Sequence, residues 1–291
     1  MHLDAATILL QWATGGLAFL WVTTRGRLVS LGYGWLLRGV FGVLALGAIG
    51  AESRAGHTGS GHVVFMAGAG GLVAAAMVAL VVSVLRRDAG VSAAREVRAL
   101  ASERVAAMAR RADVAPQAKE GVATPCREFP PPVDLVAPIA GAVGLIGAAG
   151  FTGGEQWLTI ARLLVGAAFL GVVTDAMLLG HWYLTQPGLP REPIKELVRL
   201  AMCVWPVEVA VLLIPPGMIG VLRGARSDGY GGLLGWMWVV CAVTTVILFW
   251  VTWLALRERF YSAVMAATGL LYLAILTAFG TDLVARALLA P

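Results

Sequence analysis

The chain has 291 residues, of which 59% are hydrophobic and 13% are charged. Soluble domains average about 45–50% apolar and about 25% charged residues, so this composition excludes an ordinary soluble fold. The net charge of +5 does not indicate a nucleic-acid-binding protein, because the basic residues lie between apolar blocks and form no separate basic domain. These blocks are about 20 residues long, the length at which a helix crosses the hydrocarbon core of a bilayer. The sequence therefore predicts an all-α integral membrane protein.

Eight apolar blocks, taken in chain order, predict eight transmembrane helices. They cover residues 5–24, 30–51, 63–85, 134–151, 157–183, 194–222, 231–256 and 260–288. The chain is thereby divided into helices 1–3 (1–85), an extramembrane segment (86–133) and helices 4–8 (134–291). The first block follows no basic n-region and contains no signal-peptidase site, so we expect it to be retained as a helix.

The distribution of Lys and Arg predicts the orientation. Sixteen Lys and Arg residues lie in or next to the loops on one side of the predicted membrane, and five are assigned to the opposite side. In bacterial-type membranes the side richer in Lys and Arg faces the cytoplasm. We therefore expect both termini outside, residues 86–133 inside, and a multi-pass protein of a bacterial inner membrane.

The segment 86–133 is expected to contain a basic amphipathic helix followed by a linker. Apolar residues recur at helical spacing among arginines in its first half. They are Val97, Leu100, Val105 and Met108. Residues 115–132 are rich in proline and small side chains, which favours an extended linker. The helix is interpreted as resting on anionic membrane lipid, in preference to docking another protein subunit.

Internal matches indicate a duplication of the chain. The sequence GLAFLWVTT at 16–24 is identical to GAAFLGVVT at 166–174 at six of nine positions. Three shorter matches follow in the same order, and one of them pairs Arg38 with Arg199. Matches at corresponding helices favour a 4+4 parallel repeat, with two four-helix units about a pseudo-two-fold axis along the membrane normal. The expected units are about 1–151 and 157–291. This layout is similar to that of quinone-binding membrane subunits of the polysulfide-reductase type, with which the chain shares no motif.

The most individual segment, 180–200, lies at the predicted cytoplasmic interface. Its residues His181, Trp182 and Tyr183 are candidates for binding a quinone ring or a lipid headgroup. An aromatic belt with snorkelling basic residues is the favoured alternative. The segment is also a candidate surface for other protein subunits.

Three charged residues, Asp175, Arg38 and Arg199, are further candidates near the same interface. Hydropathy alone would place Asp175 in the bilayer, but the duplication aligns it with Arg25 and predicts a position near the surface. The two arginines could clamp a phosphate or pair with Asp175. Snorkelling towards the headgroups is the simpler interpretation of both.

Glu208 is the strongest candidate for a charge inside the membrane. It lies near the middle of the sixth predicted span, beside Trp205 and Pro206. Such a carboxyl is costly in lipid and often marks a proton or ion path, although a protonated carboxyl held by a neighbouring helix is an equal alternative. The prolines at 215 and 216 predict a second interruption of the same span.

The sequence predicts no covalent or metal cofactor. His57 and His62, with Glu52 nearby, are a weak candidate for a metal on the outer face, because a solvated turn is the favoured interpretation of this Gly-rich loop. A bis-histidine haem needs two histidines at one depth, and His181 is the one histidine predicted on the inner side. No Walker or HExxH motif and no nucleophile elbow is present, so no catalytic residue is predicted.

Three functions are compatible with these features. The favoured one is a cofactor-free, non-catalytic membrane subunit of a respiratory or electron-transfer complex, with membrane lipids and other subunits as partners and a bound quinone or phospholipid. The first alternative is a small-solute or proton-coupled transporter that uses Glu208. The second is an enzyme acting on lipid headgroups, which would need an acid and a base close together. Nucleic acid is not expected as a partner.

Overall fold

The structure is a computed structural model that describes residues 4–26, 28–86, 130–151, 155–186, 189–215, 217–225 and 229–290. Within these ranges every regular element is a helix and no sheet is formed. The amphipathic helix predicted within 86–133 lies outside the described residues, as does the linker up to residue 129.

The first half of the chain forms three long helices and a shorter fourth one. They are α1 (Ala5–Arg25), α2 (Leu31–Ala55), α3 (Ser60–Leu85) and α5 (Val136–Ala149), the last preceded by the short 3-10 helix η2 (Pro131–Leu135). The second half forms α6 (Gln156–Thr185), α7 (Glu192–Leu213), the short α8 (Met218–Leu222), α9 (Leu233–Ala255) and α10 (Tyr261–Leu289). All eight predicted helical blocks therefore contain a helix.

Seven helices of the described part are long and apolar enough to cross a membrane, with η2 and α5 counted together. The chain is thus a helical multi-pass membrane protein, as its composition predicts. The remaining long helix, α7, has 22 residues and includes five charged ones. Four of these five lie in its first eight residues, and the fifth is Glu208.

The sixth predicted span, 194–222, is wrong as a single helix. Helix α7 ends at Leu213, and α8 begins at Met218. Pro215 has no backbone N–H and disfavours helical backbone at the residue before it, and Ile214 accordingly takes a non-helical conformation. Pro206, by contrast, lies inside α7 without ending it. The short helix α8 then packs against the ends of α7, α9 and α10 in a small separate apolar core that includes Met218 and Trp238.

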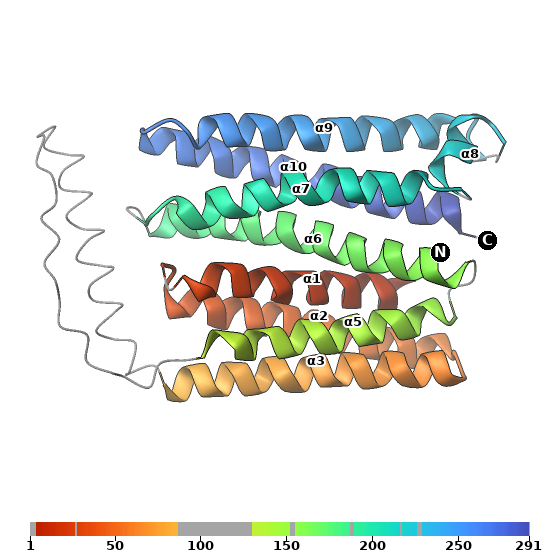
Figure 1. Cartoon of the computed structure of the whole chain (residues 1–291), viewed down its shortest axis with the longest axis horizontal. Coiled ribbons are helices and arrows are strands. Elements are labelled where there is room, and N and C mark those ends of the chain that lie inside the picture. Colours follow the sequence, from red (N-terminus) through yellow and green to blue (C-terminus); the bar gives the residue numbers. More distant parts are fainter. Residues whose placement is uncertain are drawn as a thin grey trace, which may run out of the picture.

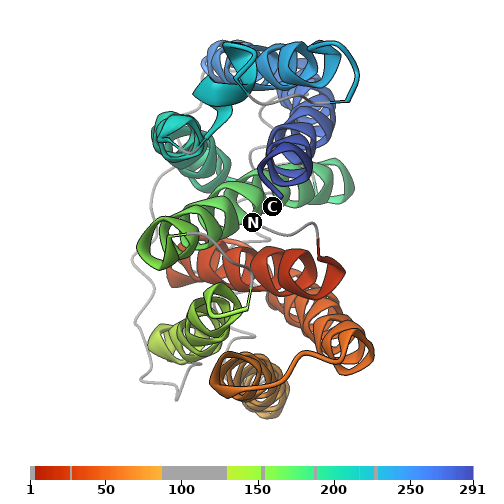
Figure 2. The ribbon, with the colours of Figure 1, turned by 90° about the vertical axis from the view of Figure 1, so that its right-hand side faces the viewer.

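The long helices lie side by side in two groups (Figure 1). Seen from the end in Figure 2, α1, α2, α3 and α5 surround one centre, and α6, α7, α9 and α10 surround another. In each group the first helix packs on the second, the second on the third, the third on the fourth and the fourth on the first. The groups meet mainly where α1 packs against α6. Helix α1 begins and α10 ends at the same end of the bundle (Figure 1).

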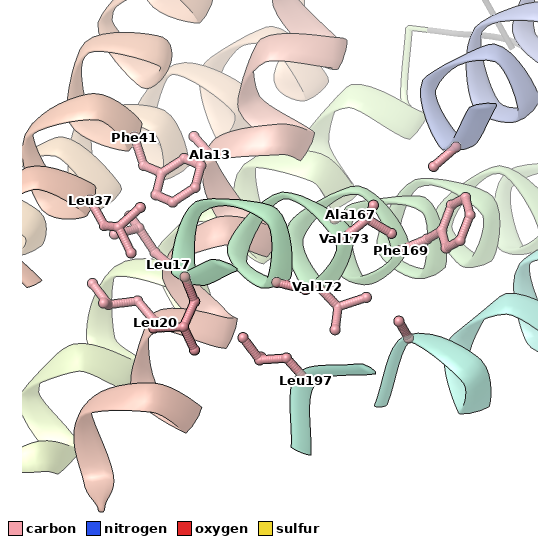
Figure 3. Packing of buried hydrophobic residues seen from close by; sticks show 14 of the residues in the cluster. Ala13, Leu17, Leu20, Leu37, Phe41, Ala167, Phe169, Val172, Val173 and Leu197 are labelled. Carbon is pink, nitrogen blue, oxygen red and sulfur yellow. The ribbon is translucent and has the colours of Figure 1, made fainter. Parts of the chain in front are cut away.

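The contact between α1 and α6 is close because glycines face each other there. A methyl group on Gly15 would overlap the backbone carbonyl of Ala167, and one on Gly171 would overlap the backbone of Gly15. Around this contact the core is built from buried apolar side chains of both groups of helices (Figure 3). They include Leu17 and Leu20 of α1, Leu37 and Phe41 of α2, Val172 of α6 and Leu197 of α7.

Substitution of Gly15 by Leu is expected to destabilise the bundle, because the side chain would have to push α6 away from α1. Overpacking of this kind costs about 1–3 kcal/mol or more. The measurement is thermal unfolding of the purified protein in detergent. Gly39 on α2 is the matched control, since a Cβ there meets nothing within 4 Å. Equal melting temperatures of the two leucine variants would contradict the close contact.

Candidate functional site

Five polar residues from four helices gather near the end of the bundle where α1 begins and α10 ends. They are Gln11 of α1, Arg162 of α6, Glu208 of α7, and Asp282 and Arg286 of α10. All five are buried, with at most 5% of each residue exposed. We call this set the buried polar cluster.

Arg162 connects α6 to the broken end of α7. Its Nε donates a hydrogen bond to the carbonyl of Val211 (3.2 Å), and its Nη2 donates one to the carbonyl of Ile214 (2.8 Å). The last carbonyls of a helix have no partner within the helix, and they carry the negative end of the helix dipole. Because Pro215 ends α7 at this point, the guanidinium of Arg162 supplies the missing donors.

Asp282 and Arg286 form an ion pair along α10. The Nε of Arg286 donates to the Oδ2 of Asp282 at 2.7 Å, and both side chains are 1% exposed. The pair is incompletely satisfied, because Oδ1 of Asp282 and Nη2 of Arg286 have no hydrogen-bond partner among the described residues. One hydrogen-bond acceptor of Asp282 and one donor of Arg286 therefore remain without a partner in the described structure.

Gln11 brings α1 into the cluster. Its amide nitrogen lies so close to Gly166 of α6 that a methyl group on this glycine would overlap it. The same methyl group would lie 3.1 Å from Oδ1 of Asp282. The absence of a side chain at Gly166 therefore allows Gln11 and Asp282 to approach each other across α6. Both polar atoms of the Gln11 side chain lack a hydrogen-bond partner within the described structure.

Glu208 is fully buried, and neither of its carboxylate oxygens accepts a hydrogen bond from a described residue. It lies within electrostatic reach of three charged groups, Asp282, Arg286 and Arg162. The cluster thus holds two basic and two acidic side chains, and its net charge is zero when all four are ionised. A buried polar group without a partner costs about 1–3 kcal/mol, and a charged one costs more. The arrangement is therefore suited to receive a polar solute or a proton.

A second buried ion pair lies at the opposite end of the bundle and is fully satisfied. Arg38 of α2 donates from Nε and Nη2 to the two carboxylate oxygens of Asp134 in η2, at 2.9 and 2.8 Å. The hydroxyl of Thr24 donates to the same carboxylate at 3.1 Å. Snorkelling of Arg38 is thus wrong, because its side chain is 3% exposed and paired inside the bundle. Arg38 is thus paired with Asp134 and not with Asp175.

Arg199 and Asp175 occupy different surroundings. Arg199 is exposed, and its guanidinium stacks over the ring of Trp253 at 4.6 Å. Asp175 is fully buried, and its carboxylate has no hydrogen-bond partner among the residues described. The duplication did not predict this burial, which arises because α6 packs against α1 and α5 of the first group as well as against α7 and α10 of its own. The aligned residue Arg25 ends α1 instead.

The aromatic candidates of α6 do not converge on one pocket. His181 is exposed, and its Nδ1 lies 3.1 Å from the hydroxyl of Tyr272 in α10. Trp182 packs against the ring of Tyr33 in α2, with centroids 5.7 Å apart. Tyr183 is buried and donates its hydroxyl hydrogen to the carbonyl of Pro190. The three side chains therefore face α10, α2 and the connection to α7.

The histidines near the connection between α2 and α3 are brought together by Glu52. The Nδ1 of His57 lies 3.1 Å from its carboxylate and the Nδ1 of His62 lies 2.7 Å from it, while Glu52 itself is fully buried. His57 also stacks on Phe151 at 4.5 Å. The expected solvated turn is thus a hydrogen-bonded cluster. Over the described residues no group of three or more His, Cys, Asp or Glu side chains could hold a metal ion.

Sequence reasoning found Glu208 and missed the other four members of the cluster. Arg162 and Arg286 lie inside the predicted spans 157–183 and 260–288, although they were assigned to the outer side for orientation. Asp282 and Arg286 are four residues apart, so they share one face of a helix in an otherwise apolar run. This four-residue spacing inside a predicted span was the signal from which the buried pair could have been predicted. The polar role of Gln11 has no comparable signal in the sequence.

Comparison of the chain with protein-family models, with curated proteins and with solved structures finds no match. The class that the fold defines is a helical multi-pass membrane protein, and the buried polar cluster is its candidate functional site.

Proposed function

We propose that this protein is a proton-coupled transporter of a small solute and that Glu208 is the residue that takes up and releases the proton. The observation that carries the proposal is the complete burial of the Glu208 carboxyl, without a hydrogen-bond partner in the described structure, among Arg162, Asp282 and Arg286. Ionisable groups inside membrane-spanning bundles are costly and commonly line proton or substrate paths.

The Arg38–Asp134 pair provides the internal comparison. That pair has the properties of a structural ion pair, since two hydrogen bonds join the partners and Thr24 supplies a third. Glu208 is equally buried but lacks such bonds. A carboxyl that served packing alone would be satisfied in the same way, because an unpaired one reduces stability. The contrast supports a role for Glu208 in function.

The topology that goes with this function has α7 as an eighth transmembrane helix. Its support is that α7 packs against α6 and α9 and that four of its charges lie in its first eight residues, at one end of the helix. The order of contacts within the two groups of helices supports a 4+4 duplication, and the distribution of Lys and Arg supports outer termini in a bacterial inner membrane. The buried polar cluster then lies towards the outer face, on the second unit and its boundary with α1.

The test is solute-driven proton movement in reconstituted vesicles. Purified full-length protein is placed in liposomes that contain a trapped pH-sensitive dye, and amino acids, organic cations, organic anions and sugars are added one at a time. At least one solute should change the internal pH with the wild-type protein and not with Glu208→Gln. If no solute gives a signal that depends on Glu208, the transporter proposal fails.

The subunit of an electron-transfer complex remains the second proposal. Its support is the buried Asp175 carboxylate, which lies near Tyr33 and could pair with a quinone or headgroup. Purification from native membranes with intact partners, followed by extraction of bound quinone, tests it. A lone protein without quinone would rule it out.

A further inference from the structure

The buried polar cluster contains donors and acceptors that the described residues leave without partners. The donors are the amide nitrogen of Gln11 and Nη2 of Arg286. The acceptors are the amide oxygen of Gln11, both oxygens of Glu208 and Oδ1 of Asp282. Each residue is at most 1% exposed, so bulk water does not reach these atoms. A ligand that satisfies the cluster needs both a hydrogen-bond acceptor group and a hydrogen-bond donor group.

The charges of the cluster also favour a ligand of zero net charge. Arg162 and Arg286 balance Glu208 and Asp282 when all four are ionised. A bound cation or anion would add an uncompensated charge to a buried site, which is costly in a medium of low dielectric constant. A zwitterion adds no net charge and supplies one group of each sign.

We propose that the solute is a small zwitterion with an ammonium and a carboxylate group, bound at the buried polar cluster by Glu208, Asp282, Arg286 and Gln11. This inference rests on the proposed transport function and names its substrate class. The ammonium donates to the oxygens of Glu208 and to Oδ1 of Asp282. The carboxylate accepts from Nη2 of Arg286 and from the amide of Gln11, since an arginine donor suits a carboxylate acceptor.

The same geometry determines the direction of coupling. The ammonium group and a proton both need the carboxylate of Glu208, so they compete for it. By linkage, each lowers the affinity for the other by the same factor. The coupling is therefore an exchange in which entry of the zwitterion accompanies exit of a proton.

The charged groups that face Glu208 are few among the described residues. Helix α6 contributes Arg162, and α10 contributes Asp282 and Arg286. Helix α9 also packs against α7, and its titratable residue Cys241 faces Gly280 of α10. Helix α8 carries no charged residue. Glu208 is thus the acidic group of this site that has no basic partner in direct contact.

The first experiment measures binding to the purified full-length protein in buffered detergent. Glycine, alanine and β-alanine are tested separately by calorimetry, with propionate and ethylammonium as ligands that carry one charged group each. At least one amino acid should bind about tenfold more tightly than both single-charge ligands, and its affinity should fall as the pH is lowered. Glu208→Gln and Gln11→Leu should each weaken this binding about tenfold or more. If Gln11→Leu does not fold, as judged by size exclusion, Gln11→Met replaces it.

The second experiment adds the same amino acids to vesicles that contain a pH-sensitive dye. Exchange predicts that the lumen becomes more alkaline with the wild-type protein. Acidification of the lumen would overturn the exchange mechanism.

The outcomes separate the substrate class from the function. A Glu208-dependent signal with propionate, ethylammonium or a sugar, and none with amino acids, would overturn the zwitterion and leave the transporter intact. The absence of any Glu208-dependent signal would overturn both.

Discussion

Replacement of Asp134 by Asn is expected to lower the free energy of unfolding by about 3–5 kcal/mol, because the guanidinium of Arg38 would stay buried without its counter-charge. The pair is 2–3% exposed, and each carboxylate oxygen accepts from Arg38. Arg38→Met is expected to cost a similar amount. Reversible unfolding of the purified protein in mixed detergent micelles measures both changes.

Two controls separate the buried pair from ordinary surface charge. Arg38→Met combined with Asp134→Leu removes both charges together, so it should recover most of the lost stability. Glu196→Gln breaks the pair with Arg25, whose side chains are about 40% exposed, and should change stability by less than about 1 kcal/mol. If Asp134→Asn were as mild as Glu196→Gln, the buried pair would not be a structural element of the fold.

Arg38 also shows which features of a buried residue can be predicted from the sequence and which cannot. Hydropathy and the duplication placed it inside a predicted span, near the cytoplasmic interface. Its partner could not be predicted, because Asp134 is 96 residues away and lies in a short 3-10 helix between a linker and a span. Contacts over such separations depend on how the helices pack, and the period of a single helix does not contain that information.

The positions of the helices were predictable because the bilayer imposes a length on each apolar block. The end of α7 was predicted only in part: Pro206 and Pro215 were both expected to disturb the helix, and only the second, which is followed directly by another proline, ends it. The difference is consistent with their surroundings. Arg162 supplies donors to the carbonyls released near Pro215, and that arginine comes from another helix.

Asp175 shows the limit of the duplication as a guide. The alignment gives a residue its depth along the helix but not its neighbours. Arg25 lies at the exposed end of α1, whereas Asp175 lies in the part of α6 that helices cover on several sides. Burial in a bundle depends on the position of the helix as well as on the depth of the residue, and α6 is central.

Glu208→Gln is expected to reduce solute-driven proton movement by about 100-fold or more while changing the free energy of unfolding by less than about 1 kcal/mol. The amide has nearly the same shape as the carboxyl but can neither take up a proton nor carry the negative charge. Because the described residues give the carboxylate no hydrogen bond, its replacement breaks none of them. A purely structural carboxyl would show the opposite pattern, a loss of stability with flux retained.

The matched control for flux is Glu196→Gln, which alters an exposed carboxyl on the same helix and should leave proton movement within about twofold of wild type. Glu208→Asp keeps the ionisable group about one methylene shorter, so partial activity is expected from it. Activity of Glu208→Gln close to that of Glu196→Gln would remove Glu208 from the proton path. In that case Asp282, the other buried carboxylate of the cluster with an unpartnered oxygen among the described residues, would have to be tested in its place. The ranking of the two is physical, since Asp282 has Arg286 at 2.7 Å as an ion-pair partner and Glu208 has no comparable bond.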